Sequence, residues 1–398
     1  MNILYIHQYF KTPKQPGGTR SYWLAQELIK NGHCVTIVTA GDDDSLYDEE
    51  QEIIIDGIKV KYFNIRYSQS MSILARLKSF MAFIYKASLY SLKHKDIDLV
   101  FATSTPLTVG IPALLLKRFK RIPYIFEVRD LWPEVPIQMG ALKNKFIRKL
   151  AVILEKTIYR NAKHVIALSP GMEDGVLKYI SKDRTSMIPN MSKKDEFWPR
   201  EKNLQKISDL GLDMDTFKVV HFGSLGLANG AHAIIESAKI LAEDSTVEFL
   251  FVGGGATEHT LKEKVIEYGL NNVKFLGKFP MKDVSEIVNF SDVSIVSFLD
   301  LPILYTNSPN KLFDSLSAGK PIIVNSAGWT KELVEKFNCG FYVNPVQPVQ
   351  LVEKIKYLQS NPSIVAEMGE KSRWLAENKY DKSILAKQFV EVIERVMK

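Results

Sequence analysis

The chain has 398 residues, of which 46% are hydrophobic and 24% charged, and its net charge at pH 7 is +7. This length is too great for one ordinary hydrophobic core and predicts two domains of about 200 residues each. Two cysteines exclude a disulfide framework, and no run of about 18 apolar residues occurs that could cross a membrane.

The basic charge favours an anionic partner, such as a nucleotide, a phospholipid surface or nucleic acid. Nucleic acid is the least favoured, because the chain has no zinc-finger spacing and no aromatic RNA-binding signature. Ordinary solubility would also account for the charge. The cysteines match no metal spacing and suit a reducing, cytosolic setting.

Short β-branched runs alternate with amphipathic stretches in the first half of the chain. The opening residues MNILYI predict a buried strand, at 2–5, and not a signal peptide. A helix is predicted over 20–31, and further strands over 34–39, 99–102, 124–128 and 164–168. This alternation predicts a parallel sheet with helices on both faces.

Gly17 and Gly18 stand between the first strand and the first helix. Glycines allow the backbone to approach a ligand closely, and a helix N-terminus offers free N–H groups to a phosphate. We therefore expect both glycines to approach a phosphate or a sugar, although an ordinary tight turn would also use them.

Two acidic runs, at 41–50 and 212–215, resemble paired aspartates that hold a metal. Neither run follows the end of an apolar strand that would aim it into a site. We therefore expect no metal site.

Two stretches of the first half interleave apolar and basic residues at helical spacing. The first stretch, 71–95, has no acidic residue, and the second covers 143–160. Their apolar members are Met71, Ile73, Leu74, Leu77, Phe80, Met81, Phe83, Ile84 and Tyr85, then Phe146, Ile147, Leu150 and Ile153. Their basic members are Arg76, Lys78, Lys86, Lys93 and Lys95, then Lys143, Lys145, Arg148 and Lys149. The pattern predicts binding to a membrane surface, although helices that pack on a sheet show a similar pattern.

The segment IFEVRDLWPEVP places Glu127, Arg129, Asp130 and Glu134 at or just after a predicted strand. Charged residues after a buried strand lie at the edge of the sheet where ligands bind. Arg129, Asp130 and Glu134 are therefore the predicted catalytic residues. The alternative is a helix start that Asp130 caps.

The alternation breaks at IPNMSKKDEFWPR (188–200) and then resumes, with strands predicted over 218–222, 247–252, 273–276, 293–296 and 321–324. We read this segment as a linker between an N-terminal domain, 1–198, and a C-terminal domain, 199–380. Each half is predicted to be doubly wound, so ligands are expected beyond the carboxyl ends of the strands, in a cleft between the halves.

Two strands of the second half end in glycine, at Gly223 in HFGSLGLANG and at Gly254 in FVGGG. Neither matches the dinucleotide fingerprint, which disfavours a nicotinamide enzyme. In TNSPNKLFDSLSAGKPIIV, Asn310 and Lys311 are predicted in the first turn of a helix and Asp314 one turn later. A lysine there opposes the helix dipole unless an anion is bound, and Asp314 could accept hydrogen bonds from ribose. The alternative is a surface helix with incidental charges.

These motifs together resemble glycosyltransferase family 4, a retaining family with the GT-B fold. The resemblance runs from HQYF and the diglycine through VRDLWPE, IALSPGM with IPN, FGSLG, FVGGG and KFLGKFP to PNKLFDSLSAGKP. The chain looks most similar to the subgroup that transfers N-acetylfucosamine or related N-acetylhexosamines in O-antigen and capsule assembly. The resemblance implies that the N-terminal domain binds the acceptor and the C-terminal domain the nucleotide donor. It also implies that residues 381–398 form a helix that returns to the first domain.

Several positions depart from the family pattern. The family's donor-clamping arginine and lysine correspond to Ser224 and Asn229, and the first of two glutamates corresponds to Thr306. A histidine frequent in the family is replaced by Arg129. Lys311 and Lys262 are the cations nearest to the donor loops in sequence. The expected donor-binding set is Gly17, Gly18, Gly223, Ser224, Gly254, Lys262, Asn310, Lys311 and Asp314.

The expected activity is retaining transfer from a UDP-sugar, a substrate, with no cofactor and no metal. The expected acceptor is a polyprenyl-diphosphate-linked saccharide at the inner face of the cytoplasmic membrane, where the protein would be peripheral. A sugar-nucleotide epimerase or hydrolase on the same fold, or a catalytically silent binding subunit, remain the alternatives.

Overall fold

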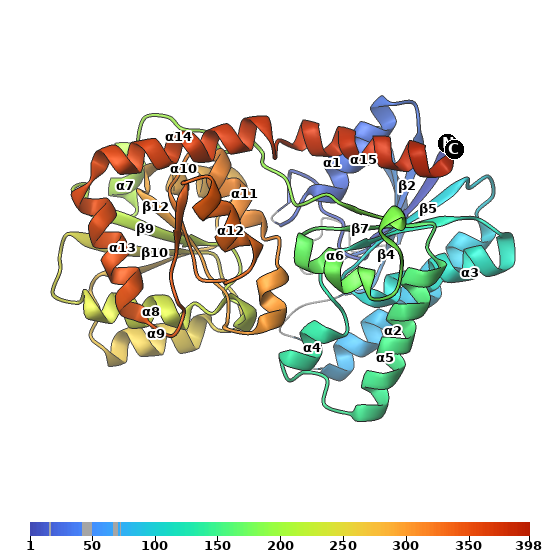
Figure 1. Ribbon diagram of the computed structural model, residues 1–398, viewed down its shortest axis with the longest axis horizontal. Coiled ribbons are helices and arrows are strands. Elements are labelled where there is room, and N and C mark those ends of the chain that lie inside the picture. Colours follow the sequence, from blue (N-terminus) through green and yellow to red (C-terminus); the bar gives the residue numbers. More distant parts are fainter. Residues whose placement is uncertain (16, 42–49, 67–70, 72) are drawn as a thin grey trace. The chain divides into compact units, whose positions relative to one another are not determined.

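The computed structural model describes residues 1–15, 17–41, 50–66, 71 and 73–398 (Figure 1). These residues form two compact α/β units, as the sequence predicts. The first unit is Met1–Pro189 with Ser383–Lys398, and the second is Asn190–Lys382.

The first unit is built on a sheet with the strand order β3-β4-β2-β1-β5-β6-β7-β8. Its strands are β1 (Asn2–Ile6), β2 (Cys34–Ala40), β3 (Gln51–Ile55), β4 (Ile58–Phe63), β5 (Leu99–Thr103), β6 (Tyr124–Val128), β7 (His164–Ala167) and β8 (Thr185–Met187). All neighbours are parallel except β3, which pairs antiparallel with β4 at one edge of the sheet. This hairpin is not among the predicted elements, and its turn at Asp56 and Gly57 has positive φ at both residues. An Asp-Gly pair between β-branched runs is the usual signal for such a turn.

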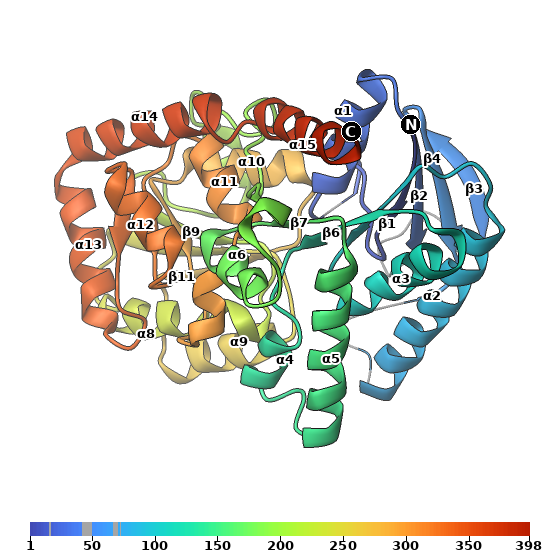
Figure 2. The ribbon, with the colours of Figure 1, turned by 45° about the vertical axis from the view of Figure 1, so that its right-hand side comes forward.

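Helices cover both faces of the first sheet. They are α1 (Arg20–Lys30), α2 (Ile73–Lys93), α3 (Gly110–Lys120), α4 (Glu134–Gln138), α5 (Lys145–Asn161), α6 (Pro170–Leu177) and α15 (Lys382–Met397), with 3-10 turns η1 (Leu107–Val109) and η2 (Lys182–Arg184). Figures 1 and 2 show α1 and α15 on one face and α2, α3 and α5 on the other. Phe389 of α15 packs edge-on against Phe101 of β5, with ring centroids 4.9 Å apart. The C-terminal helix is thus part of the core of the first unit.

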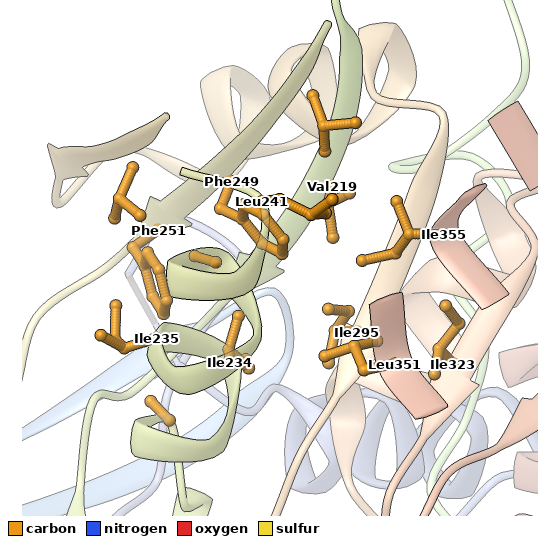
Figure 3. Close-up of a cluster of buried hydrophobic side chains, with 14 of the residues drawn as sticks. Val219, Ile234, Ile235, Leu241, Phe249, Phe251, Ile295, Ile323, Leu351 and Ile355 are labelled. Atoms are coloured by element: carbon orange, nitrogen blue, oxygen red, sulfur yellow. The ribbon is translucent and has the colours of Figure 1, made fainter. Parts of the chain in front are cut away.

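The second unit has a fully parallel sheet with the strand order β11-β10-β9-β12-β13-β14. Its strands are β9 (Phe217–Phe222), β10 (Val247–Val252), β11 (Val273–Gly277), β12 (Val293–Val296), β13 (Ile322–Val324) and β14 (Gly340–Tyr342). Its helices are α7 (Leu204–Asp209), α8 (His232–Ile240), α9 (Glu258–Glu267), α10 (Met281–Phe290), α11 (Asn310–Ser317), α12 (Trp329–Lys336), α13 (Pro348–Ser360) and α14 (Pro362–Asn378), with 3-10 turns η3 (Leu227–Asn229) and η4 (Pro302–Thr306). Figure 3 shows one side of its core, where Phe249 and Ile295 of the sheet lie with Ile234 of α8 and Ile355 of α13.

The boundary between the units falls earlier than the predicted residue 198. Arg20, the first residue of α1, donates hydrogen bonds to the carbonyls of Ile188 and Pro189 and so holds the end of the first unit. Asn190 already belongs to the second unit, since its backbone N–H donates to Ser308 Oγ at 3.1 Å. Phe197 is fully buried in a core cluster of that unit. Residues 190–198 therefore belong to the second unit. Their mixed charge predicts an exposed linker, whereas Asn190 and Phe197 pack within that unit.

Candidate active site

In the second unit, the glycines after β9 and β10 allow backbone segments to touch. A Cβ on Gly253 would lie 1.9 Å from the carbonyl oxygen of Gly223, and one on Gly255 would lie 2.6 Å from the Leu225 carbonyl. A Cβ on Gly254 would meet only side chains, those of Glu258 and Lys278. Close backbone packing of the two loops therefore explains Gly253 and Gly255, whereas Gly254 is bordered by two side chains, one of them cationic.

Lys311 lies beside Gly223, in the first turn of α11. A Cβ on Gly223 would lie 3.7 Å from Lys311 Cε, and Gly223 has a φ of +105° that favours glycine. Lys311 Nζ donates to Asn229 Oδ1 at 3.0 Å, and burial lowers its pKa to about 7. Among the described residues no carboxylate forms an ion pair with this amine. A half-buried amine at a helix N-terminus that forms no ion pair with a carboxylate is suited to receive an anion.

Asp314 already has a cationic partner within the second unit. Its Oδ1 lies 3.2 Å from Lys193 Nζ, which is also 3.6 Å from Glu196 Oε2. Burial acts to lower the pKa of Lys193, but the two carboxylates outweigh it and raise that pKa. The predicted role of Asp314 as a hydrogen-bond acceptor for ribose did not include Lys193, because nothing in the order of residues joins two positions so far apart.

The other predicted donor residues of this unit differ in how they are placed. Asn310 is half-buried at the start of α11, and Ser224 is exposed in the loop after β9. Lys262 is half-exposed on α9, where it forms an ion pair with Glu258 at 2.7 Å. The cation beside Gly254 is instead Lys278, whose Cε would lie 3.1 Å from an added Cβ. Its place directly after β11, in KFLGKFP, was the signal that could have identified it.

In the first unit, three strand ends meet at Arg129. Its backbone N–H donates to Ser104 Oγ at 3.0 Å, just after β5. Its Nη1 lies 3.4 Å from His7 Nε2, just after β1. His7 Nδ1 in turn lies 2.8 Å from Ser21 Oγ, in the first turn of α1. Gly17, with a φ of +126°, leads into that helix, so the structure joins the diglycine loop to Arg129 through His7 and Ser21.

His7 was not among the predicted site residues. Its signal was its position directly after the first strand, in the HQYF motif. Of the two glycines before α1, Gly17 is exposed and Gly18 is half-buried.

The other charged residues of the segment IFEVRDLWPEVP lie in different environments. Burial raises the pKa of the half-buried Asp130 to about 6, and the neighbouring Arg129 opposes the shift. Glu127 lies inside β6, where Arg20 Nε donates to it at 2.9 Å and Thr103 also donates to it. Glu134 is exposed at the start of α4 and accepts a hydrogen bond from Gln138 at 2.6 Å. The structure thus brings Arg129 and Asp130 to the strand ends, makes Glu127 structural, and gives Glu134 no contact with Arg129.

The acidic runs show no metal centre in the part of the chain that the structure covers. Residues 42–49 of the first run lie outside the described residues. In the second run, Asp213 Oδ1 accepts the N–H of Asp215 at 2.9 Å, which makes a local turn. No three His, Cys, Asp or Glu side chains of the described residues gather as metal ligands would.

Comparisons with known proteins agree with this architecture. The family profile "Glycosyl transferase 4-like domain" matches residues 17–191, and "Glycosyl transferases group 1" matches residues 203–375. The chain is a GT-B glycosyltransferase. Family and fold are thus as the sequence predicts, while neither profile tests the N-acetylfucosaminyl subgroup.

Three similar proteins span nearly the whole glycosyltransferase chain. An uncharacterized glycosyltransferase of Methanocaldococcus jannaschii is 22% identical over 94% of this chain and 93% of its own. The capsular polysaccharide biosynthesis glycosyltransferase CapM of Staphylococcus aureus is 21% identical over 86% of this chain and 89% of its own. The Anabaena protein HepE in complex with UDP has a TM-score of 0.71 and 20% identity, covering 99% of this chain and 100% of that chain.

Proposed function

We propose that this glycosyltransferase transfers an N-acetylhexosamine, with N-acetyl-L-fucosamine as first candidate, from a UDP-sugar to a lipid-linked saccharide with retention of configuration. The observation that carries the proposal is Lys311, a half-buried amine beside Gly223 that pairs with no carboxylate among the described residues. A nucleotide diphosphate supplies the anion that this position lacks. UDP is the first nucleotide to test because the similar fold of HepE binds it.

Donor binding is proposed to need no metal, because lysine and helix N–H groups meet the phosphate charge. Lys311 must be protonated to pair with the diphosphate, and its pKa without ligand is about 7. UDP affinity, measured by calorimetry in chelator, should therefore fall as the pH rises from about 6.5 to 8.5.

Lys311→Met should weaken UDP binding at least tenfold and abolish this pH dependence. Lys371→Met is the matched control, since Lys371 pairs with Glu367 on the exposed part of α14. Affinity that is independent of pH in the wild type, or that requires manganese, would contradict the proposed donor site.

Arg129 and Asp130 are the proposed catalytic residues. In a retaining enzyme of this fold the leaving phosphate is thought to help deprotonate the acceptor, and the protein positions the substrates and stabilises charge. Arg129→Ala should slow turnover at least tenfold, or about 1.4 kcal/mol. An unchanged rate in a folded variant would remove Arg129 from the site.

The acceptor is proposed to be held at a membrane surface by α2 and α5. The exposed large apolar side chains of α2 include Leu74, Leu77, Met81 and Tyr85, and those of α5 include Phe146, Ile147, Leu150 and Ile153. Their spacing places each set on one helix face. Phe83 instead packs toward β4, with its ring centroid 6.2 Å from that of Phe63, so part of the predicted apolar arc belongs to the core. No helix of the described residues is long and apolar enough to cross a membrane.

Cations on the same helices would add about 1 kcal/mol each near anionic lipid. Together with an acceptor whose polyprenyl tail stays in the bilayer, this gives the proposed peripheral location at the inner face of the cytoplasmic membrane. The similarity to CapM supports the proposed role in capsular polysaccharide assembly, and O-antigen assembly is proposed as the alternative. No nucleic acid is proposed as a partner.

Liposome flotation tests the membrane part. Changing Arg76, Lys78 and Lys86 to glutamate should release the protein from anionic vesicles and leave UDP binding unchanged. The control changes three lysines of the second unit, Lys282, Lys336 and Lys371, to glutamate. If the wild-type protein does not bind anionic vesicles at low salt, a soluble acceptor is favoured over a lipid-linked one.

A further inference from the structure

We propose that His7 is a positioning residue, a neutral Nδ1–H imidazole whose Nε2 accepts a hydrogen bond from Arg129 and fixes its guanidinium at the ends of β1 and β6. This proposal rests on the proposed function of Arg129 for its effect on catalysis. Its geometry concerns the first unit alone.

The imidazole is held on three sides. His7 is only 3% exposed, directly after β1 in the middle of the sheet. Its ring stacks against Tyr5, with centroids 6.4 Å apart and an interplanar angle of 26°. Nδ1 lies 2.8 Å from Ser21 Oγ, and Nε2 lies 3.4 Å from Arg129 Nη1. The ring therefore links the first turn of α1 to the end of β6.

The partners determine the tautomer. A guanidinium has only N–H donors, so the nitrogen that faces Arg129 must be the acceptor. A neutral imidazole then carries its proton on Nδ1, which donates to Ser21 Oγ. Burial, with the charge of Arg129 adding to it, holds the pKa of His7 well below its usual value. Both effects act in the same direction, toward a neutral ring.

A neutral acceptor suits a guanidinium that has to bind an anion. A carboxylate in the place of His7 would pair with Arg129 and cancel much of its charge. Histidine orients the guanidinium and leaves that charge for the substrate. Arg129 forms no ion pair with a carboxylate among the described residues of the first unit, in contrast to Arg20, which pairs with Glu127 at 2.9 Å.

Nitrogen-15 NMR of labelled histidines tests the geometry without any substrate. The His7 signal is assigned by its loss in His7→Gln. At pH 7 we expect a protonated Nδ1 and an unprotonated Nε2. A protonated Nε2, or a doubly protonated ring, would overturn the proposal whether or not the protein transfers sugar.

A mutant cycle tests the link to catalysis. His7→Leu should lower kcat about tenfold, whereas His7→Gln should stay within about threefold because its Oε1 can accept from Arg129. Adding His7→Leu to Arg129→Met should cost nothing further, since the first change acts through Arg129. Independent, multiplicative losses would show a merely structural role and overturn the proposal. If the wild type transfers no sugar from any donor, the proposed function fails, and the NMR result still decides the state of His7.

Discussion

The ion pair between Lys193 and Asp314 gives the sharpest test of how the second unit holds the helix that carries Lys311. Both side chains are almost fully buried, with exposed fractions of 6% and 7%, and their charged atoms lie 3.2 Å apart. Lys193→Met removes the cation and leaves Asp314 and Glu196 without it. Breaking a buried pair in this way costs about 3–5 kcal/mol, because a charge stays behind without a partner.

For a unit of this size, about 1 kcal/mol shifts the melting temperature by roughly 2–4 °C. Lys193→Met should therefore lower the melting temperature of the second unit by roughly 6–20 °C. Adding Asp314→Asn should restore part of that loss, because the double variant leaves one buried charge fewer.

Calorimetry of the wild type and the three variants, Lys193→Met, the double variant and Lys371→Met, measures these shifts. Lys371 forms an exposed ion pair with Glu367 at 2.5 Å, and such a pair contributes about 0.5 kcal/mol. Equal shifts in melting temperature for Lys193→Met and Lys371→Met would show that the ion pair of Lys193 with Asp314 does not stabilise the second unit. Asp314 would then be available to accept hydrogen bonds from ribose.

Two further predictions concern Asp130 and the glycine loops. Because burial raises the pKa of Asp130 to about 6, the folded protein binds more protons than the unfolded chain between about pH 4 and 6, so its stability falls as the pH rises through that window. Asp130→Asn should remove this fall in stability, which urea unfolding at several pH values measures, and should slow sugar transfer at least tenfold. If the stability of the variant depends on pH as in the wild type, the raised pKa of Asp130 is contradicted. Gly253→Ala should destabilise the second unit by more than about 2 kcal/mol in urea unfolding, since its Cβ would lie 1.9 Å from the Gly223 carbonyl oxygen. Gly254→Ala is the milder control, and equal losses would show that the contact is relieved at little cost.

The sequence predicts the alternating strands and helices well, because the periodicity of apolar residues and the apolar content of a segment are local properties. Strands that are mostly apolar, such as 247–252, match the structure residue for residue. The strands β3, β4, β8 and β14 have no counterpart in the sequence prediction. β3 alternates exposed and half-buried residues, β4 contains two lysines, and β8 and β14 have three residues each, so none forms a strong apolar run.

The same distinction between local and long-range features applies to the candidate site. Lys311 and Arg129 were identified because each follows directly from a local motif. The Lys193 partner of Asp314 and the contact of His7 with Arg129 depend on residues more than a hundred positions apart, which only the folded sheets bring together. Glu127 and Glu134 were grouped with Arg129 by proximity in sequence, yet one lies inside a strand and the other on an exposed helix start.

In the proposed reaction the diphosphate of a UDP-sugar contacts Lys311 and the sugar passes to a lipid-linked acceptor. This reaction is tested most directly by the transfer of labelled N-acetylhexosamines from UDP to a polyprenyl-diphosphate-linked saccharide, in chelator, with extraction of the lipid product. We expect labelled lipid with the wild type and at least a tenfold lower rate with Lys311→Met. Release of free sugar without labelled lipid, or equal rates for both proteins, would contradict it.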